Sequence, residues 1–181
     1  MYEKACEDLR YTEMYAKLAS ILSSKHPDFS ISLLKHVDAN YKRLLESGIV
    51  DGRKKETLTG IVYAGQLFNC RIVDCKMMDQ MVMSLFCGNN REVLEPRLEM
   101  VCALLGVIGK QMDDRCGRGR VHQYLQRVKK NEKKLLSNRI KHLLKEVSEL
   151  RDNNWNPRWT KRDSAQLSSA QKLSCCRAAT R

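Results

Sequence analysis

Apolar and polar residues alternate with a regular period in the stretch 135–159. The apolar positions recur about every 3.6 residues, which draws one face of an amphipathic helix: Ile140, Leu143, Leu144, Val147 and Leu150. Ser137 or Asn138 can cap the start of this helix, and the short polar residues 152–154 can end it. Trp155 follows directly. We therefore expect Trp155 to fold back over the end of the helix.

The same period predicts six further helices upstream, separated by short breaks. They cover 11–24, 29–46, 56–70, 74–87, 92–112 and 121–136. The breaks contain glycine, proline, asparagine and aspartate, which favour turns. The chain holds only 3 prolines and few β-branched residues, so we predict helices and no strand. The predicted fold class is all-α.

Seven helices joined by short loops can alternate in direction, so that neighbouring helices form antiparallel pairs. The pairs recur about every 40 residues, a spacing typical of HEAT-type α-solenoids, in which each pair buries its apolar face on the next. A compact helical bundle is the structural alternative. We expect the helical domain to occupy residues 1–159. Residues 160–181 are rich in serine, alanine and basic residues and are expected to form a disordered basic tail.

Three of the predicted helices carry signals about how they pack. The helix 56–70 contains Gly60 and Gly65, each of which costs about 1 kcal/mol relative to alanine, so close approach of a neighbouring helix should compensate. The methionines of helix 74–87 indicate core filling rather than a binding groove. Helix 92–112 is apolar on more than one side. We expect it to be central.

The chain is strongly basic, with a formal net charge of +12 and a sequence pI of about 9.4. Within 115–145, eleven lysines and arginines face a single acid, Glu132. A row of cations on a rigid surface binds a phosphate backbone through counterion release rather than by reading bases. A solvated helix face that binds nothing is the alternative. The candidate RNA-binding residues are Arg115, Arg118, Arg120, Arg127, Lys130, Lys134 and Lys141.

Membrane, secreted and metal-binding classes are not indicated. No apolar run approaches the roughly 20 residues of a membrane span, and residues 1–10 lack the pattern of a signal peptide. We therefore expect a cytoplasmic protein without a membrane partner, whose 8 cysteines lie in a reducing compartment. The cysteines are scattered without a Cys-x-x-Cys pair, so no zinc site or other cofactor is predicted. Cys75 should be a small buried residue.

The sequence also lacks the arrangements that catalysis requires. The basic segment 117–120 is too short for a phosphate cradle, and no Gly-Lys-Ser/Thr occurs. Ser137 and Ser148 have no strained elbow around them. Asp113 and Asp114 lie at a helix end, where we expect them to be solvated. We predict that the chain is not an enzyme.

Several segments resemble the middle domain of eukaryotic translation initiation factor 4 gamma, in the order in which that family has them. Residues 137–159, SNRIKHLLKEVSELRDNNWNPRW, are similar to its C-terminal helix and the Asn-Trp-x-Pro-Arg exit. Residues 58–68, LTGIVYAGQLF, and 104–110, LLGVIGK, resemble two internal helices. Shorter matches are Tyr15-Ala16-Lys17-Leu18, the helix 29–36, FSISLLKH, and Gln123-Tyr124.

This resemblance implies a HEAT-repeat scaffold that does no chemistry itself. In the family the domain clamps the DEAD-box RNA helicase, initiation factor 4A, and touches RNA with its basic surface. The chain would then promote mRNA recruitment in translation initiation as a monomer, without sequence preference for the mRNA. The residues that the resemblance implies for helicase binding are Phe29, Leu33, Leu34, Lys35, His36, Tyr63, Phe68, Arg151, Trp155 and Arg158.

The chain departs from the family pattern in four places. The family domain begins with a further helix, which is not found upstream of Tyr11, and the end of a solenoid without its cap exposes an apolar face. The family's long charged insertion between the second and third predicted helices is cut to a few residues. Lys35 replaces an asparagine and His122 replaces an acidic residue. A paralogous adaptor in mRNA decay, cap-binding or poly(A)-linked complexes, or a truncated competitor of the full scaffold, are therefore the alternative functions.

Overall fold

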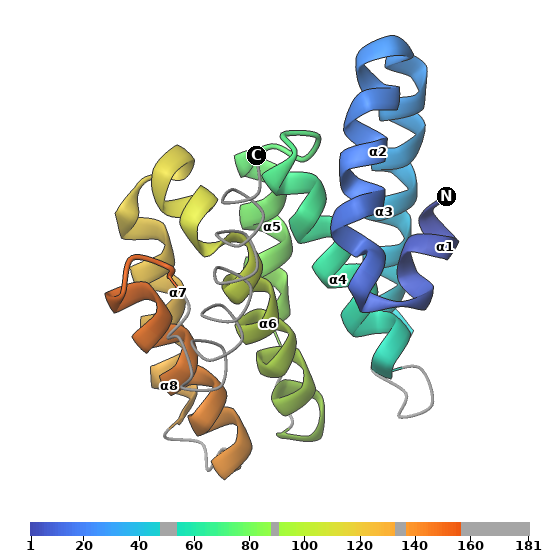
Figure 1. Ribbon diagram of the computed structural model, residues 1–181. Coiled ribbons are helices and arrows are strands. Elements are labelled where there is room, and N and C mark those ends of the chain that lie inside the picture. Colours follow the sequence, from blue (N-terminus) through green and yellow to red (C-terminus); the bar gives the residue numbers. More distant parts are fainter. Residues whose placement is uncertain (48–53, 88–90, 133–136, 157–181) are drawn as a thin grey trace, which may run out of the picture.

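A computed structural model describes residues 1–47, 54–87, 91–132 and 137–156 (Figure 1). These residues contain no strand. They form eight α-helices and one short 3-10 helix: α1 (Tyr2–Glu7), η1 (Leu9–Tyr11), α2 (Thr12–Lys25), α3 (Pro27–Ser47), α4 (Lys54–Asn69), α5 (Cys75–Leu85), α6 (Arg91–Cys116), α7 (Arg118–Glu132) and α8 (Asn138–Asp152). The predicted all-α class is confirmed.

The seven predicted helices correspond to α2 to α8, whereas α1 was not predicted. With 6 residues, α1 is too short to establish a helical period in the sequence. Tertiary packing holds it in place: Ala5 is fully buried, and the ring of Tyr2 packs edge to face on Tyr63 of α4, with 5.7 Å between ring centroids. Packing rather than local propensity therefore explains this helix.

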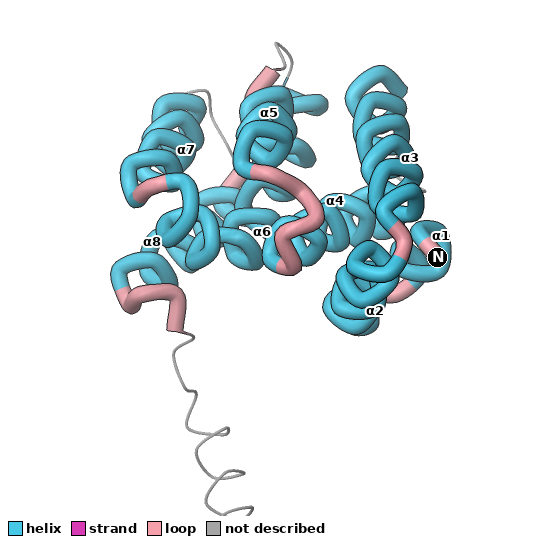
Figure 2. Tube along the Cα trace, turned by 90° about the horizontal axis from the view of Figure 1, so that it is seen from above, coloured by secondary structure: helices cyan, strands magenta, loops and turns pink. Residues whose placement is uncertain are grey.

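The helices are arranged in two layers. Helices α2, α4, α6 and α8 form a row in which each helix packs against the next. Helices α3, α5 and α7 lie along one side of this row (Figure 2). The array is elongated, with α2 and α3 at one end and α7 and α8 at the other (Figure 1). This arrangement is the predicted HEAT-type α-solenoid and not the compact bundle.

Helix α6 lies at the centre of the core, as its sequence pattern predicted. Leu98, Leu104, Leu105, Ile108 and Met112 of this helix are fully buried. Gly65 of α4 allows a close approach, because a β-carbon there would lie 2.8 Å from Leu104 Cδ1 and 3.0 Å from Ile108 Cγ2. The packing role predicted for this glycine is confirmed.

Helix α8 buries the predicted apolar face against α6. Its Ile140, Leu144 and Val147 are buried. Ser137 is the N-cap residue, but its side chain makes no capping bond, and its backbone N–H donates to Glu95 Oε1 at 2.8 Å instead. The start of α8 is therefore fixed by a contact with α6 rather than by a local cap.

The sequence suggested that Cys75 is a simple buried thiol, but the residue is bonded to Cys116. The two residues are 41 positions apart, and their Cα atoms lie 6.2 Å from each other. The bond joins the start of α5 to the end of α6. The prediction for Cys75 failed because helical periodicity shows which face a cysteine occupies but not which distant sulfur it meets. Cys102, in contrast, is a buried free thiol as expected.

The predicted tail, 160–181, lies outside the described residues, so the domain boundary at 159 stays a prediction. Lys134 and Arg158 lie outside them as well. In the part of the chain that is described, no helix is long and apolar enough to cross a bilayer.

Candidate functional site

The N-terminal half of α3 presents polar side chains above an apolar base. Lys35 and His36 are exposed, whereas Leu33 is 4% exposed and belongs to the core. Phe29 and Leu34 are half-buried and pack against that core. Of the five candidate residues in this segment, Lys35 and His36 are therefore the ones that a partner can contact without rearrangement.

Tyr63 and Phe68 of α4 are fully buried, so their side chains are not available to a partner. Burial raises the pKa of the Tyr63 phenol, whose oxygen has no hydrogen-bond partner within the described structure. Phe68 lies beneath Arg115, whose guanidinium carbon is 4.5 Å from the ring centroid and whose Nη1 donates to the Phe68 carbonyl at 2.7 Å. The structure thus places Arg115 in an intramolecular contact between α4 and α6.

Trp155 folds back over the end of α8, as the sequence predicted. Its indole packs against Gly109, and its Nε1–H donates to Asp113 Oδ2 at 3.0 Å. Arg151 pairs with the same Asp113 oxygen at 3.3 Å and donates from Nη2 to the Arg118 carbonyl at 2.7 Å. These contacts tie the ends of α6 and α8 to the start of α7.

We expected Asp113 to be solvated because of its position at a helix end, and this prediction was wrong. Its side chain is largely buried beneath Arg151 and Trp155. Arg151 is also mostly buried, so this cluster stabilises the C-terminal end of the solenoid. Any partner that binds here meets the outer edge of the indole and the exposed residues Asp152–Asn154 rather than a free arginine.

The basic residues of α7 and α8 divide into paired and unpaired cations. Arg120 pairs with Asp79 of α5 at 2.9 Å. Arg127, Lys130 and Lys141 are exposed and form no ion pair within the described structure. Arg127 and Lys130 lie one turn apart on α7, and α7 packs against α8, which carries Lys141. We refer to Arg127, Lys130 and Lys141 as the α7–α8 cations.

An apolar groove between α6 and α8 was missed by the sequence analysis. It has a volume of about 410 Å³, and small residues of α6 open it opposite the apolar face of α8. The lining residues are Leu58, Glu99, Cys102, Ala103, Gly106, Leu143, Glu146, Val147 and Leu150. Ala103 and Gly106 are three positions apart on α6, which is the sequence signal that could have indicated it.

Acidic, histidine and cysteine side chains do not gather into a metal site in the described part of the chain. The arrangement instead offers surfaces: exposed polar residues on α3 at one end and the α7–α8 cations at the other. Because these surfaces lie on one rigid array of helices, they can hold two partners, or two parts of one partner, at a fixed separation.

Comparison with known proteins agrees with the fold. The chain is 34% identical over 110 residues to eukaryotic translation initiation factor 4 gamma 1 of Mus musculus, covering 60% of this chain and 7% of that protein. It is 26% identical over 192 residues to eukaryotic translation initiation factor 4G of Triticum aestivum, covering 87% of this chain and 13% of that protein.

A third relative has a different name. The chain is 22% identical over 176 residues to a von Willebrand factor A domain-containing protein of Dictyostelium discoideum, covering 87% of this chain and 8% of that protein. The chain therefore corresponds to a small part of each of these relatives. Residues 1–154 match the MIF4G domain, which is nearly all of the described structure, and the chain belongs to the MIF4G domain family.

Proposed function

We propose that this chain is a non-enzymatic scaffold of translation initiation that binds a DEAD-box RNA helicase and RNA in the cytoplasm. The observation that supports this proposal is the match of residues 1–154 to the MIF4G domain, together with relatives named as translation initiation factor 4 gamma. The helicase itself, its stimulation and the RNA contact go beyond those names and belong to the proposal.

The helicase contact is proposed at two separated sites. One is the exposed part of α3 with Lys35 and His36, and the other is the end of α8 around Trp155. The candidates Leu33, Tyr63 and Phe68 are buried and are therefore not part of either contact surface. Two weak contacts on one rigid body gain from effective concentration, so the loss of either one should weaken binding strongly.

The experiment is titration of the full chain into initiation factor 4A, followed by calorimetry and by the helicase's ATPase rate. We expect binding and a raised ATPase rate. The double variant Lys35→Glu/His36→Glu should weaken binding by at least about tenfold, because a surface contact worth about 1.4 kcal/mol corresponds to that factor. Lys76→Glu/Gln80→Glu, which changes the net charge by the same amount at two exposed positions of α5, is the matched control and should bind as the unchanged chain does.

Two results would contradict the proposal. Absence of binding by folded protein would remove the helicase as a partner. Binding that both variants weaken equally would show a general charge effect and remove the α3 site. An adaptor of another mRNA complex, or a competitor of the full scaffold, would then be favoured. In keeping with this alternative, the chain is also similar to a Dictyostelium discoideum protein that is not named as an initiation factor.

A further inference from the structure

The first two long helices expose an apolar stripe that the rest of the described structure lacks. Among the residues that the structure describes, all large hydrophobic side chains that are clearly exposed lie between Met1 and Ile31. Four of them recur on α2 and its entry turn with spacings of three, four and three: Tyr11 (48% exposed), Met14 (53%), Leu18 (42%) and Ile21 (56%). We call these four residues the α2 stripe. Spacings of three and four are those of a coiled-coil seam.

The α2 stripe faces away from the core of its own chain. The buried residues of α2 are Thr12, Ala16 and Ala19, and the helical rotation of about 100° per residue puts the stripe roughly 150° from them. Within the row α2–α4–α6–α8, α2 is a terminal helix. The stripe is therefore placed where a further helix would continue the row.

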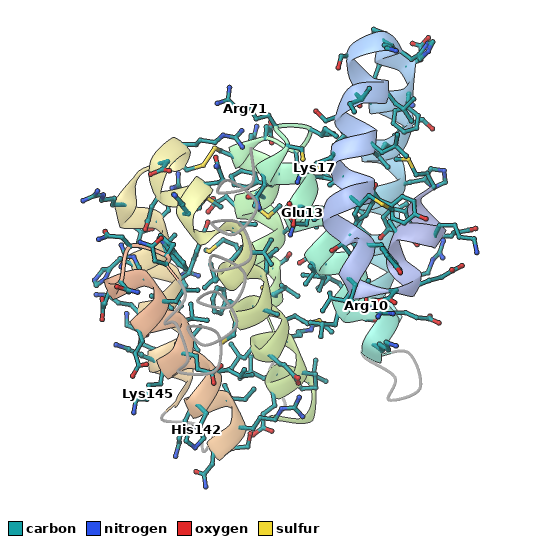
Figure 3. The ribbon with its side chains drawn as sticks, viewed as in Figure 1. Arg10, Glu13, Lys17, Arg71, His142 and Lys145 are labelled. Carbon is teal, nitrogen blue, oxygen red and sulfur yellow. A yellow bond between two sulfur atoms is a disulfide. The ribbon has the colours of Figure 1, made fainter. Side chains whose placement is uncertain are left out.

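The two ends of the row differ in chemistry. At the α8 end, the outward residues include His142 and Lys145, which are exposed and polar (Figure 3). A solenoid end that meets water is normally polar in this way. The α2 end is instead apolar, and exposed apolar patches of this kind mark interaction sites.

Charge indicates what can cover the α2 stripe. Residues 1–47 contain seven basic and seven acidic residues, so the whole net charge of +12 lies in the rest of the chain. The charged residues beside the stripe are paired with each other: Lys17 with Glu13 at 2.7 Å, and Arg10 with Asp8 at 2.6 Å (Figure 3). A neutral surface does not attract a polyanion, and it does not repel a second copy of the same basic chain.

We propose that the α2 stripe is a self-association surface at which two copies of this chain pack α2 against α2. A twofold axis perpendicular to α2, on the stripe side and at the height of residue 16, would run the two helices antiparallel, so that Met14 of one copy faces Leu18 of the other and Tyr11 faces Ile21. The dimer would extend the row of helices across the axis. It would also hold the two basic α7–α8 ends far apart (Figure 1). This differs from the monomer that the sequence analysis expected.

The stripe is small, so the dimer should be weak. Four side chains on one helix bury less than the roughly 800 Å² per partner of a standard interface. We expect a dissociation constant in the micromolar range. Each residue occurs twice in a twofold interface, which makes single substitutions unusually effective.

The test is sedimentation equilibrium of the full chain between about 1 and about 200 µM, a range that brackets a micromolar constant. The mass of one chain is 20.9 kDa, and we expect the average mass to rise towards twice that value with concentration. Leu18→Glu should weaken association by at least about a hundredfold, because a buried charge would face Met14 of the other copy. Ala39→Glu adds the same charge at an exposed position of α3 and should leave association unchanged.

Circular dichroism of each variant keeps the result interpretable, since Leu18 is exposed and its replacement should leave the helix content unchanged. A chain that remains at 20.9 kDa at the highest concentration would overturn the proposal. So would a dimer that Leu18→Glu and Met14→Glu both leave intact, because the interface would then lie elsewhere.

Discussion

Trp155 and Gly109 are in such close contact that a β-carbon at position 109 would occupy the space of the indole ring. The chain reaches this contact through an unfavourable backbone, since Asn154 and Trp155 both have positive φ, at 53° and 62°. Left-handed conformations of non-glycine residues cost of the order of 1 kcal/mol or more. The packing on Gly109 and the hydrogen bond to Asp113 offset that cost and hold the last turn in place.

Replacing Gly109 by alanine should displace the indole. We expect Gly109→Ala to lower the free energy of unfolding by about 1–3 kcal/mol, because the added methyl overpacks a filled site. The emission of Trp155, measured in a Trp159→Phe background, should shift to the red as the ring becomes solvated. Urea unfolding and fluorescence of the same sample test both effects.

Gly106→Ala provides the matched control in the same helix. No atom lies within 4 Å of a β-carbon at Gly106, and the position is exposed. Alanine there should be neutral or stabilise the protein by up to about 1 kcal/mol through helix propensity. Equal destabilisation by the two variants would mean that Trp155 does not occupy the site above Gly109.

Under oxidising conditions the Cys75–Cys116 bond should contribute measurably to stability, whereas the reducing compartment expected from the sequence would keep the two thiols free. It joins two residues that are 41 positions apart and closes a loop that includes α5 and α6, and loss of such a bond costs roughly 2–4 kcal/mol. We expect a reductant, or the double variant Cys75→Ser/Cys116→Ser, to lower the midpoint of urea unfolding. Cys87→Ser, which removes an exposed free thiol, should leave it unchanged. Alkylation of Cys75 and Cys116 in the folded, unreduced protein would show that the bond does not form.

Alkaline pH should destabilise the fold. Burial, with smaller contributions from Glu99 and Glu146, raises the pKa of the Cys102 thiol from 9.0 to about 12. Burial likewise raises the pKa of Tyr41 from 10.0 to about 12. At a pH between the ordinary pKa of each group and its raised pKa in the folded chain, the folded chain retains protons that the unfolded chain has released. The free energy of unfolding therefore decreases as pH rises above about 9. Thermal unfolding measured from about pH 8 to about pH 11 tests this.

The contribution of one group can be isolated. Cys102→Ala should flatten the alkaline decrease in thermal stability, whereas Cys87→Ala should not, because Cys87 is exposed. In the folded protein a maleimide should label Cys87 at about pH 8 and leave Cys102 unlabelled, since the protonated thiol is not the nucleophile. Rapid labelling of Cys102 without unfolding would contradict its burial.

The sequence was sufficient to predict the helices that have long apolar faces. The period around Ile140 and Leu144 identified α8, and the glycine cost at Gly65 correctly indicated close packing of α4 on another helix. These features depend on local spacing, which a single chain displays directly. Helix α1 was missed because its stability depends on Tyr63, more than 50 positions away.

The candidate site was less predictable, because a resemblance transfers residue types but not their exposure. Tyr63 and Phe68 match the family pattern, yet both are fully buried here. Arg115 belongs to the basic run, yet its guanidinium lies over Phe68. Exposure depends on which helices cover a face, and this follows from the stacking of the layers rather than from spacing along one helix.

RNA binding, if the α7–α8 cations mediate it, should be electrostatic and nearly independent of sequence. About five phosphate contacts on single-stranded RNA predict a fall in affinity by a factor on the order of 10² to 10³ between about 50 and about 200 mM salt. The triple variant Arg127→Glu/Lys130→Glu/Lys141→Glu removes about three of those contacts. The slope of log affinity against log salt should then fall from about −3.5 to about −1.4.

A second triple variant separates this local effect from the change in total charge. Lys35→Glu/Arg43→Glu/Lys76→Glu reverses three exposed cations on α3 and α5, so the net charge changes by the same amount. Long-range attraction to RNA depends on total charge and would weaken equally in both variants, whereas counterion release depends on the phosphates actually contacted. We therefore expect the control to lower affinity modestly with its salt slope unchanged. Equal slopes in the two variants would show that the α7–α8 cations are solvated and contact no phosphate.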